Sequence, residues 1–110
     1  MRYTVLSDAD NNEIMKCINM AFSDYVIPIH LTEDTLQSFF KASDINKELS
    51  FCAYSENMMV GFILNSSNLY QDERVVFDAG TGVIPEFRGK GVFSTLYAFA
   101  ERELRKCGIK

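Results

Sequence analysis

The chain has 110 residues, of which 47% are hydrophobic and 24% charged, and its formal net charge is −4 at pH 7. This length and composition are typical of a single globular domain, residues 1–110. The acidic balance excludes general attraction to nucleic acid or to anionic membranes, because both are negatively charged. Basic residues gather only at Arg88 and Lys90 and near the end of the chain, at Arg102, Arg105, Lys106 and Lys110. We therefore expect neither a nucleic-acid partner nor a membrane partner.

Three cysteines stand far apart in apolar contexts, at Cys17, Cys52 and Cys107. An odd number at this spacing is typical neither of a disulfide framework nor of a metal site. The sequence shows no leader-like segment and no long apolar run, so we expect no signal peptide and no membrane span. Together these features predict buried free thiols in a cytoplasmic protein that holds no metal.

The first half of the chain predicts a strand and two helices. Residues 3–6 form a short β-like run, and N-cap acceptors follow at positions 8, 10 and 11. Apolar residues then recur at helical spacing from Ile14 to Phe22. Pro28 ends this helix, because the residue before a proline avoids the α region. A second helix begins at Thr32, with acidic residues near its positive end.

The second half predicts three strands and a final helix. Residues 50–54 and 59–64 read as the two strands of a hairpin. We expect a polar loop at 65–72, a long strand at 74–84 and a helix at 92–107. The resulting order, β-α-α-β-β-β-α, predicts an α+β (mixed α/β) fold with a mostly antiparallel sheet and helices on its faces.

Two glycines interrupt the longest predicted strand, at Gly80 and Gly82. Glycine weakens a strand, so this pair indicates a bulge or a place where another backbone or a ligand approaches closely.

The last predicted strand and the helix after it predict one further strand. A helix that follows a strand usually crosses over to a parallel one, and the sequence stops at Lys110, where that strand would begin. We therefore expect a domain that is incomplete at its C-terminus. Its open sheet edge would pair with a second copy of the chain as a homodimer.

The stretch GVIPEFRGKGVFSTL, residues 82–96, leads from the long strand into the last helix. The first N–H groups of a helix lack intrahelical partners, and the helix dipole adds positive charge there, so such a start binds anions. Gly89 and Gly91 tolerate positive φ and remove side chains, while Arg88 and Lys90 add mobile positive charge at the rim. The loop therefore predicts a diphosphate site.

Neither standard phosphate fingerprint fits this loop. A P-loop has four residues between its glycines, whereas a single residue separates Gly89 from Gly91. The dinucleotide pattern requires glycine at position 94, where this sequence has Ser94.

The loop instead resembles motif A of the GNAT superfamily of N-acetyltransferases, whose pattern is Gln/Arg-x-x-Gly-x-Gly/Ala after a strand and a proline-bearing turn. Arg88 and Gly91 match its first and fourth positions. Phe93 stands at the sixth, where glycine or alanine is usual, and its backbone N–H remains available. The order of elements resembles the first half of this family, and AFSDYVIPIHLTEDTLQSFF is similar to the N-terminal segment of some bacterial members.

The resemblance implies an acetyl-CoA-dependent N-acetyltransferase. The pyrophosphate of acetyl-CoA would lie on the loop that carries Arg88 and on the N–H groups that follow, those of Gly89, Lys90, Gly91, Val92, Phe93 and Ser94. The pantetheine arm would pair with the strand at Thr81, Gly82 and Val83. A substrate amine would then attack the thioester directly, in a wedge between two splayed parallel strands.

The sequence assigns the catalytic and acceptor groups less specifically. Asp78, the acid within the long strand, is a candidate base, although strand acids more often face solvent. Tyr25 and His30 are candidate acceptor-pocket residues; the favoured alternatives are packing on the core for Tyr25 and a structural role for His30. The acidic balance points to cationic acceptors such as polyamines, aminoglycosides or lysine side chains.

Two other functional classes remain open. The chain would be a non-catalytic acyl-CoA-binding or regulatory module if it kept the anion loop without acid–base groups. It would be an interaction domain if its open sheet edge took up a partner strand.

Overall fold

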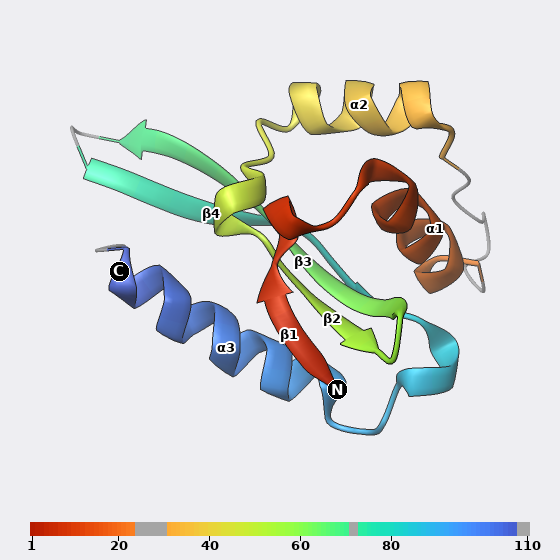
Figure 1. The fold of residues 1–110 in the computed structure, drawn as a ribbon. Helices are drawn as coiled ribbons and strands as arrows, with labels where there is room; N and C mark the ends of the chain where they lie inside the picture. Colours follow the sequence, from red (N-terminus) through yellow and green to blue (C-terminus); the bar gives the residue numbers. More distant parts are fainter. Residues whose placement is uncertain (24–30, 71–72, 108–110) are drawn as a thin grey trace.

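One antiparallel sheet organises the part of the chain that the structure describes. The computed structural model describes residues 1–23, 31–70 and 73–107. Its sheet has the order β1 (Arg2–Val5), β2 (Phe51–Ser55), β3 (Met58–Tyr70) and β4 (Glu73–Val83), each strand antiparallel to the next (Figure 1).

Helices cover both faces of this sheet. Over the same residues the α-helices are α1 (Asn11–Ala21), α2 (Glu33–Ala42) and α3 (Val92–Lys106). Helices α1 and α2 lie on one face, and α3 crosses the opposite face (Figure 1). The order β-α-α-β-β-β-α and the α+β class expected from the sequence are confirmed.

The first two helices begin where side chains cap them. The Asp10 carboxylate accepts from the Glu13 N–H at 2.8 Å, and the Glu13 side chain accepts from the Asp10 N–H at 3.3 Å. Thr32 and Thr35 form the same reciprocal pair at the start of α2, as the predicted start at Thr32 requires. These capping boxes satisfy N–H groups that a helix leaves unpaired at its first turn.

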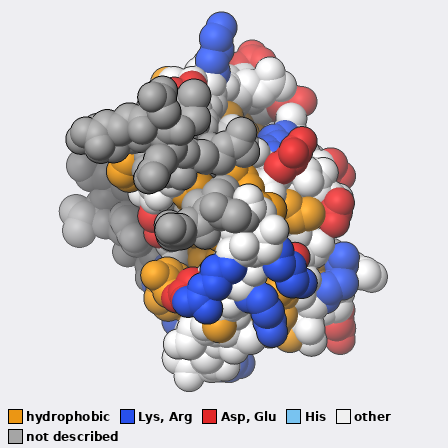
Figure 2. All heavy atoms as spheres, turned by 90° about the vertical axis from the view of Figure 1, so that its left-hand side faces the viewer, with side chains coloured by type: hydrophobic (Ala, Val, Ile, Leu, Met, Phe, Trp, Pro, Cys, Tyr) orange, Lys and Arg blue, Asp and Glu red, His pale blue; other side chains and the backbone are white. Residues whose placement is uncertain are grey.

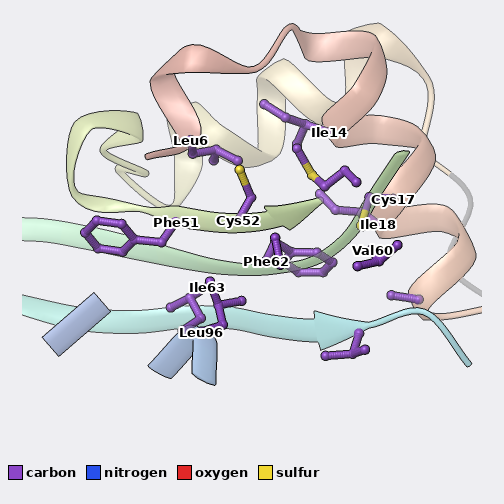
Figure 3. Close-up of a cluster of buried hydrophobic side chains, with 14 of the residues drawn as sticks. Leu6, Ile14, Cys17, Ile18, Phe51, Cys52, Val60, Phe62, Ile63 and Leu96 are labelled. Atoms are coloured by element: carbon purple, nitrogen blue, oxygen red, sulfur yellow. The ribbon is translucent and has the colours of Figure 1, made fainter. Parts of the chain in front are cut away.

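The hydrophobic core has one layer on each face of the sheet. On the side of α1 and α2, the rings of Phe22 and Phe62 meet edge to face with centroids 6.1 Å apart. On the side of α3, Phe51 and Phe99 make the same kind of contact at 5.7 Å. Figure 3 shows the two layers, with α1 above the strands and the Leu96 region of α3 below.

The prediction of a polar loop at 65–72 is wrong for residues 65–70, and residues 71 and 72 lie outside the described part of the chain. Strand β3 continues to Tyr70, and its last residue pairs with Glu73 at the start of β4. This part of the β3–β4 ribbon projects beyond the helices (Figure 1). The sequence of residues 65–70, NSSNLY, lacks the apolar–polar alternation by which a strand is recognised, so the pattern did not predict this part of β3.

Strands β3 and β4 change register at a β-bulge. Leu64 pairs with Gly80, but the next residue, Asn65, pairs with Asp78, so Ala79 has no opposite residue in this register. In a regular strand, side chains two residues apart point to the same face of the sheet. The extra residue of a bulge shifts this alternation, so side chains two residues apart across the bulge point to opposite faces. The irregularity expected from the glycines of this strand is confirmed.

A buried polar corner holds β3 at the bulge. The Asn65 N–H donates to the Ser50 hydroxyl at 2.8 Å, and the Asn65 side-chain amide donates to the Leu49 carbonyl at 2.7 Å. Ser50 and Asn65 are both buried. Buried polar groups are costly unless they are paired, so these bonds fix the position of the bulge.

The cysteines divide into two kinds. Cys17 and Cys52 are buried as expected, and desolvation raises the pKa of each thiol to about 12, so both stay protonated near neutral pH. Cys107 is exposed, which contradicts the expectation of a third buried thiol. It caps the C-terminal end of α3, where the helix has passed beyond its buried residues Val92, Leu96 and Ala100.

Candidate functional site

The loop between β4 and α3 contains two glycines in the left-handed backbone region. Gly89 has φ 76° and Gly91 has φ 80°, and other residues adopt such angles only at a cost. A Cβ atom on either glycine would meet nothing within 4 Å. Backbone conformation therefore requires glycine here, and the space beside both residues is open to a ligand.

Helix α3 begins without a side-chain cap, unlike α1 and α2. Its N-cap is Gly91, and the Thr95 N–H donates to the Gly91 carbonyl at 3.1 Å as the first bond of the helix. The N–H groups of Val92, Phe93 and Ser94 come before that bond. Free amides and the positive end of the helix dipole together make this corner suited to an anion.

A hollow of about 220 Å³ lies at the same corner. Residues 87–89 and 91–94 line it together with Val83. It thus joins the end of β4 to the first turn of α3, the corner where the sequence analysis expects a diphosphate, and that role stays a prediction. The Phe93 ring is half exposed and lies against the Tyr97 ring of the next turn, with centroids 6.0 Å apart.

The two cations of the loop lie differently from each other. The Lys90 ammonium stays at the surface, 5.3 Å from the centroid of the Phe87 ring. The Arg88 guanidinium donates to the Val83 carbonyl at 3.0 Å and to the Ala21 carbonyl, at the end of α1, at 2.5 Å. Mobile positive charge at the rim is therefore a wrong description of Arg88, whose side chain is anchored by main-chain acceptors.

The predicted pantetheine-binding residues lie on a sheet edge. Residues 81–83 of β4 pair with residues 61–63 of β3, and no other described strand pairs with β4. A Cβ atom on Gly82 would come within 2.8 Å of the Phe62 ring and 3.2 Å of the Ala21 Cβ. Gly82 is therefore needed for close packing against α1, while the other edge of its strand is left for a ligand or a partner strand.

The Asp78 carboxylate is bonded within its own strand. It accepts from the Gly80 N–H at 2.9 Å and from the Thr81 hydroxyl at 2.7 Å. Asp78 lines a hollow with Tyr97 of α3, whereas Gly80, past the bulge, lines a cavity on the side of α1 and α2. The spacing Asp-x-Gly is a common turn signal that the sequence already carried. These hydrogen bonds give the Asp78 carboxylate a structural role in its own strand. Its role as a catalytic base stays a prediction.

The other two acceptor-site candidates, Tyr25 and His30, lie outside the described residues. The structure adds a feature that the sequence did not reveal, an apolar cavity of about 270 Å³ between α1, α2 and the β3–β4 pair. Its walls come from four separate elements, so spacing along the chain carries no signal for it. Gly80 was the one sign of open space at this place.

Two other kinds of feature are absent from the part of the chain that the structure describes. Within residues 1–23, 31–70 and 73–107, no group of three or more His, Cys, Asp or Glu side chains could hold a metal ion. No described helix has the length and apolar character needed to span a membrane. Figure 2 shows Lys and Arg side chains gathered on the lower part of one face.

A model of the Acetyltransferase (GNAT) family matches residues 13–110. The chain belongs to this family. The resemblance expected from the loop at residues 82–96 is thereby confirmed. No curated protein matches the chain.

Solved structures of acetyltransferases share the fold. A GNAT family acetyltransferase from Brucella melitensis in complex with acetyl-CoA has a TM-score of 0.70 at 18% identity, over 97% of this chain and 70% of that one. An aminoglycoside acetyltransferase from an uncultured soil metagenomic sample, in complex with sisomicin, has 0.69 at 15%, over 99% and 71%. A glucosamine N-acetyltransferase region of a fungal multi-domain β-N-acetylglucosaminidase has 0.68 at 20%, over 90% of this chain and 11% of that one.

Proposed function

We propose that this GNAT chain binds acetyl-CoA and transfers its acetyl group directly to an amine. One observation carries the proposal: α3 begins uncapped, directly after two left-handed glycines that leave open space beside the backbone. The diphosphate of acetyl-CoA lies on the amides of Val92, Phe93 and Ser94, with Lys90 at the rim. The coenzyme is a co-substrate in this scheme.

The pantetheine arm pairs with the open edge of β4 at residues 81–83. With that pairing the thioester lies beside β4. Helices α1 and α2 cover one face of the sheet at this strand, and α3 covers the other. Holding the two reactants together in this way makes the attack effectively intramolecular.

The reaction needs one bond to form and one to break. An alkyl ammonium first loses a proton, because its ordinary pKa is near that of lysine, about 10.4. The nitrogen lone pair attacks the thioester carbonyl carbon, the C–S bond breaks, and the sulfur leaves as the thiolate of coenzyme A and takes up a proton. The acetylated nitrogen loses its second proton to give the neutral amide.

A charge placed at the start of α3 tests the proposal. Ser94 is exposed in the first turn, where an aspartate stabilises the helix through its dipole. Ser94→Asp should therefore keep or raise the unfolding free energy, yet weaken acetyl-CoA binding about tenfold or more by repelling the diphosphate. Ser94→Asn, which has the same shape without the charge, is the matched control and should bind much more tightly than Ser94→Asp.

Binding is measured by calorimetry and by thermal unfolding. Acetyl-CoA at 100 times its dissociation constant should raise the unfolding free energy of the parent protein by about 2.7 kcal/mol, and acetate should not. Equal acetyl-CoA affinity in Ser94→Asp and Ser94→Asn would show that the diphosphate does not lie at this corner. Release of thiol from acetyl-CoA in the presence of amines separates transfer from non-catalytic binding.

A further inference from the structure

The apolar cavity on the side of α1 and α2 is a preformed space of about 270 Å³. Phe22 at the C-cap of α1, Phe39 of α2 and Phe62 of β3 contribute aromatic walls, and Gly80 of β4 lies at its base. Every residue of the described lining is apolar or glycine, and none of them carries a charge. These described walls therefore favour a hydrocarbon group over a polar one.

The base of the cavity is open at Gly80, which has no side chain. A Cβ atom on Gly80 would meet only Leu64 Cδ1, at an ordinary contact distance of 3.7 Å. Two residues further on, the ring of Phe62 fills the corresponding space at Gly82, where a Cβ atom would come within 2.8 Å of it. Packing of the described residues therefore does not require glycine at position 80.

Hydrogen bonds hold one wall of the cavity in place. The Asn19 side chain of α1 donates to the Leu31 carbonyl at 3.0 Å and accepts from the Leu31 N–H at 2.6 Å. Leu31 precedes the N-cap of α2 and lines the cavity. This two-bond clamp fixes the start of α2 against α1, so the cavity keeps its shape without a ligand.

The position of the cavity relates it to the coenzyme. Gly80 directly precedes residues 81–83, the part of β4 along which we placed the pantetheine arm. We propose that this cavity binds the apolar alkyl or aryl group of the acceptor, so that the substrate is a monoamine with a hydrophobic substituent. The inference rests on the proposed function and names its substrate class.

This acceptor differs from the one that net charge alone indicated. A polyamine would place a second ammonium among apolar walls with no carboxylate in the described lining, and an unpaired buried charge is strongly disfavoured. An alkyl chain in the same place gains affinity with each methylene that it buries, about fourfold per group. The described walls of the cavity therefore favour hydrophobic amines over polyamines.

Two isosteric amines test the inference on the full chain. n-Pentylamine and 1,4-diaminobutane have the same length and differ only in a terminal methyl or ammonium group. Titration by NMR, with and without saturating coenzyme A, gives a dissociation constant for each without any need for turnover. n-Pentylamine should bind about tenfold more tightly or better, with shift changes at Gly80 and Leu64.

Two neighbouring residues of α2 provide matched variants. Phe39 lines the cavity, whereas Phe40, which is also partly buried, faces other hollows. Phe39→Ala should weaken n-pentylamine about fivefold, and Phe40→Ala should change it less than about twofold. The unfolding free energy of each variant is measured alongside, and the two amines on the parent protein give the answer if either variant unfolds.

The outcomes separate this inference from the proposed function. If acetyl-CoA stabilises the protein but 1,4-diaminobutane binds as tightly as n-pentylamine, the hydrophobic acceptor is wrong and the transferase proposal stands. If acetyl-CoA does not stabilise the protein, the proposed function falls, and the acceptor role of the cavity falls with it.

Discussion

Arg88 joins two parts of the molecule that are distant in sequence. Its guanidinium donates to Val83 at the end of β4 and to Ala21 at the end of α1. The carbonyl end of a helix carries partial negative charge, which favours a cation there. We infer that Arg88 positions the loop before α3 against α1, and so aligns the coenzyme corner with the helix that borders the acceptor cavity.

Arg88→Lys tests this positioning role, because lysine keeps the charge but cannot reproduce the planar, multiply donating guanidinium. We expect a loss of about 1–2 kcal/mol in unfolding free energy and weaker acetyl-CoA binding. Lys90→Gln is the control: it removes a surface charge of the same loop and should lower acetyl-CoA affinity at nearly unchanged stability. Calorimetry and denaturant unfolding measure both. An Arg88→Lys protein with parental stability and affinity would show that only the charge of Arg88 matters.

At the scale of elements, the bulge in β4 decides which groups can share a site. In a regular strand, residues 78, 80 and 82 would point to one face. The bulge instead puts Asp78 in a hollow with Tyr97 of α3, while Gly80 and Gly82 face α1. An amine seated in the apolar cavity is therefore on the other side of the sheet from the Asp78 carboxylate, which favours a structural role for this acid.

Asp78→Asn separates the structural role from the catalytic one. If the carboxylate only supports the bulge, the unfolding free energy should fall by about 1 kcal/mol, while acetyl-CoA affinity and the pH profile of thiol release stay as in the parent. Thr81→Val removes the hydroxyl that donates to Asp78 and should have a similar, non-additive effect on stability. A fall in kcat of about a hundredfold with loss of the acidic limb of the pH profile would instead identify Asp78 as the general base.

Local chemistry made part of this molecule predictable. Thr32 is a good helix N-cap, and the glycines beside Lys90 tolerate left-handed backbone, so the start of α2 and the conformation of the loop follow from a few neighbouring residues. The features that sequence reasoning missed depend on residues far apart. Arg88 reaches Ala21 only because β4 and α1 are packed together, and the apolar cavity exists only between four assembled elements.

At the scale of the whole molecule, the outer edge of β4 is the main unpaired surface of the described sheet. Exposed strand edges pair readily with other strands, and β4 also carries the exposed Phe77. We expect two copies of the chain to associate through this edge as a homodimer.

Acetyl-CoA and a second copy would compete for the same edge, since the pantetheine arm uses residues 81–83. Sedimentation should show a monomer–dimer equilibrium that depends on protein concentration and shifts toward monomer when acetyl-CoA is saturating. Phe77→Lys places a charge on the exposed part of β4 and should weaken the dimer about tenfold without changing acetyl-CoA affinity. A monomer at every concentration without acetyl-CoA would exclude edge pairing. A dimer that acetyl-CoA leaves intact would place its interface elsewhere on the molecule.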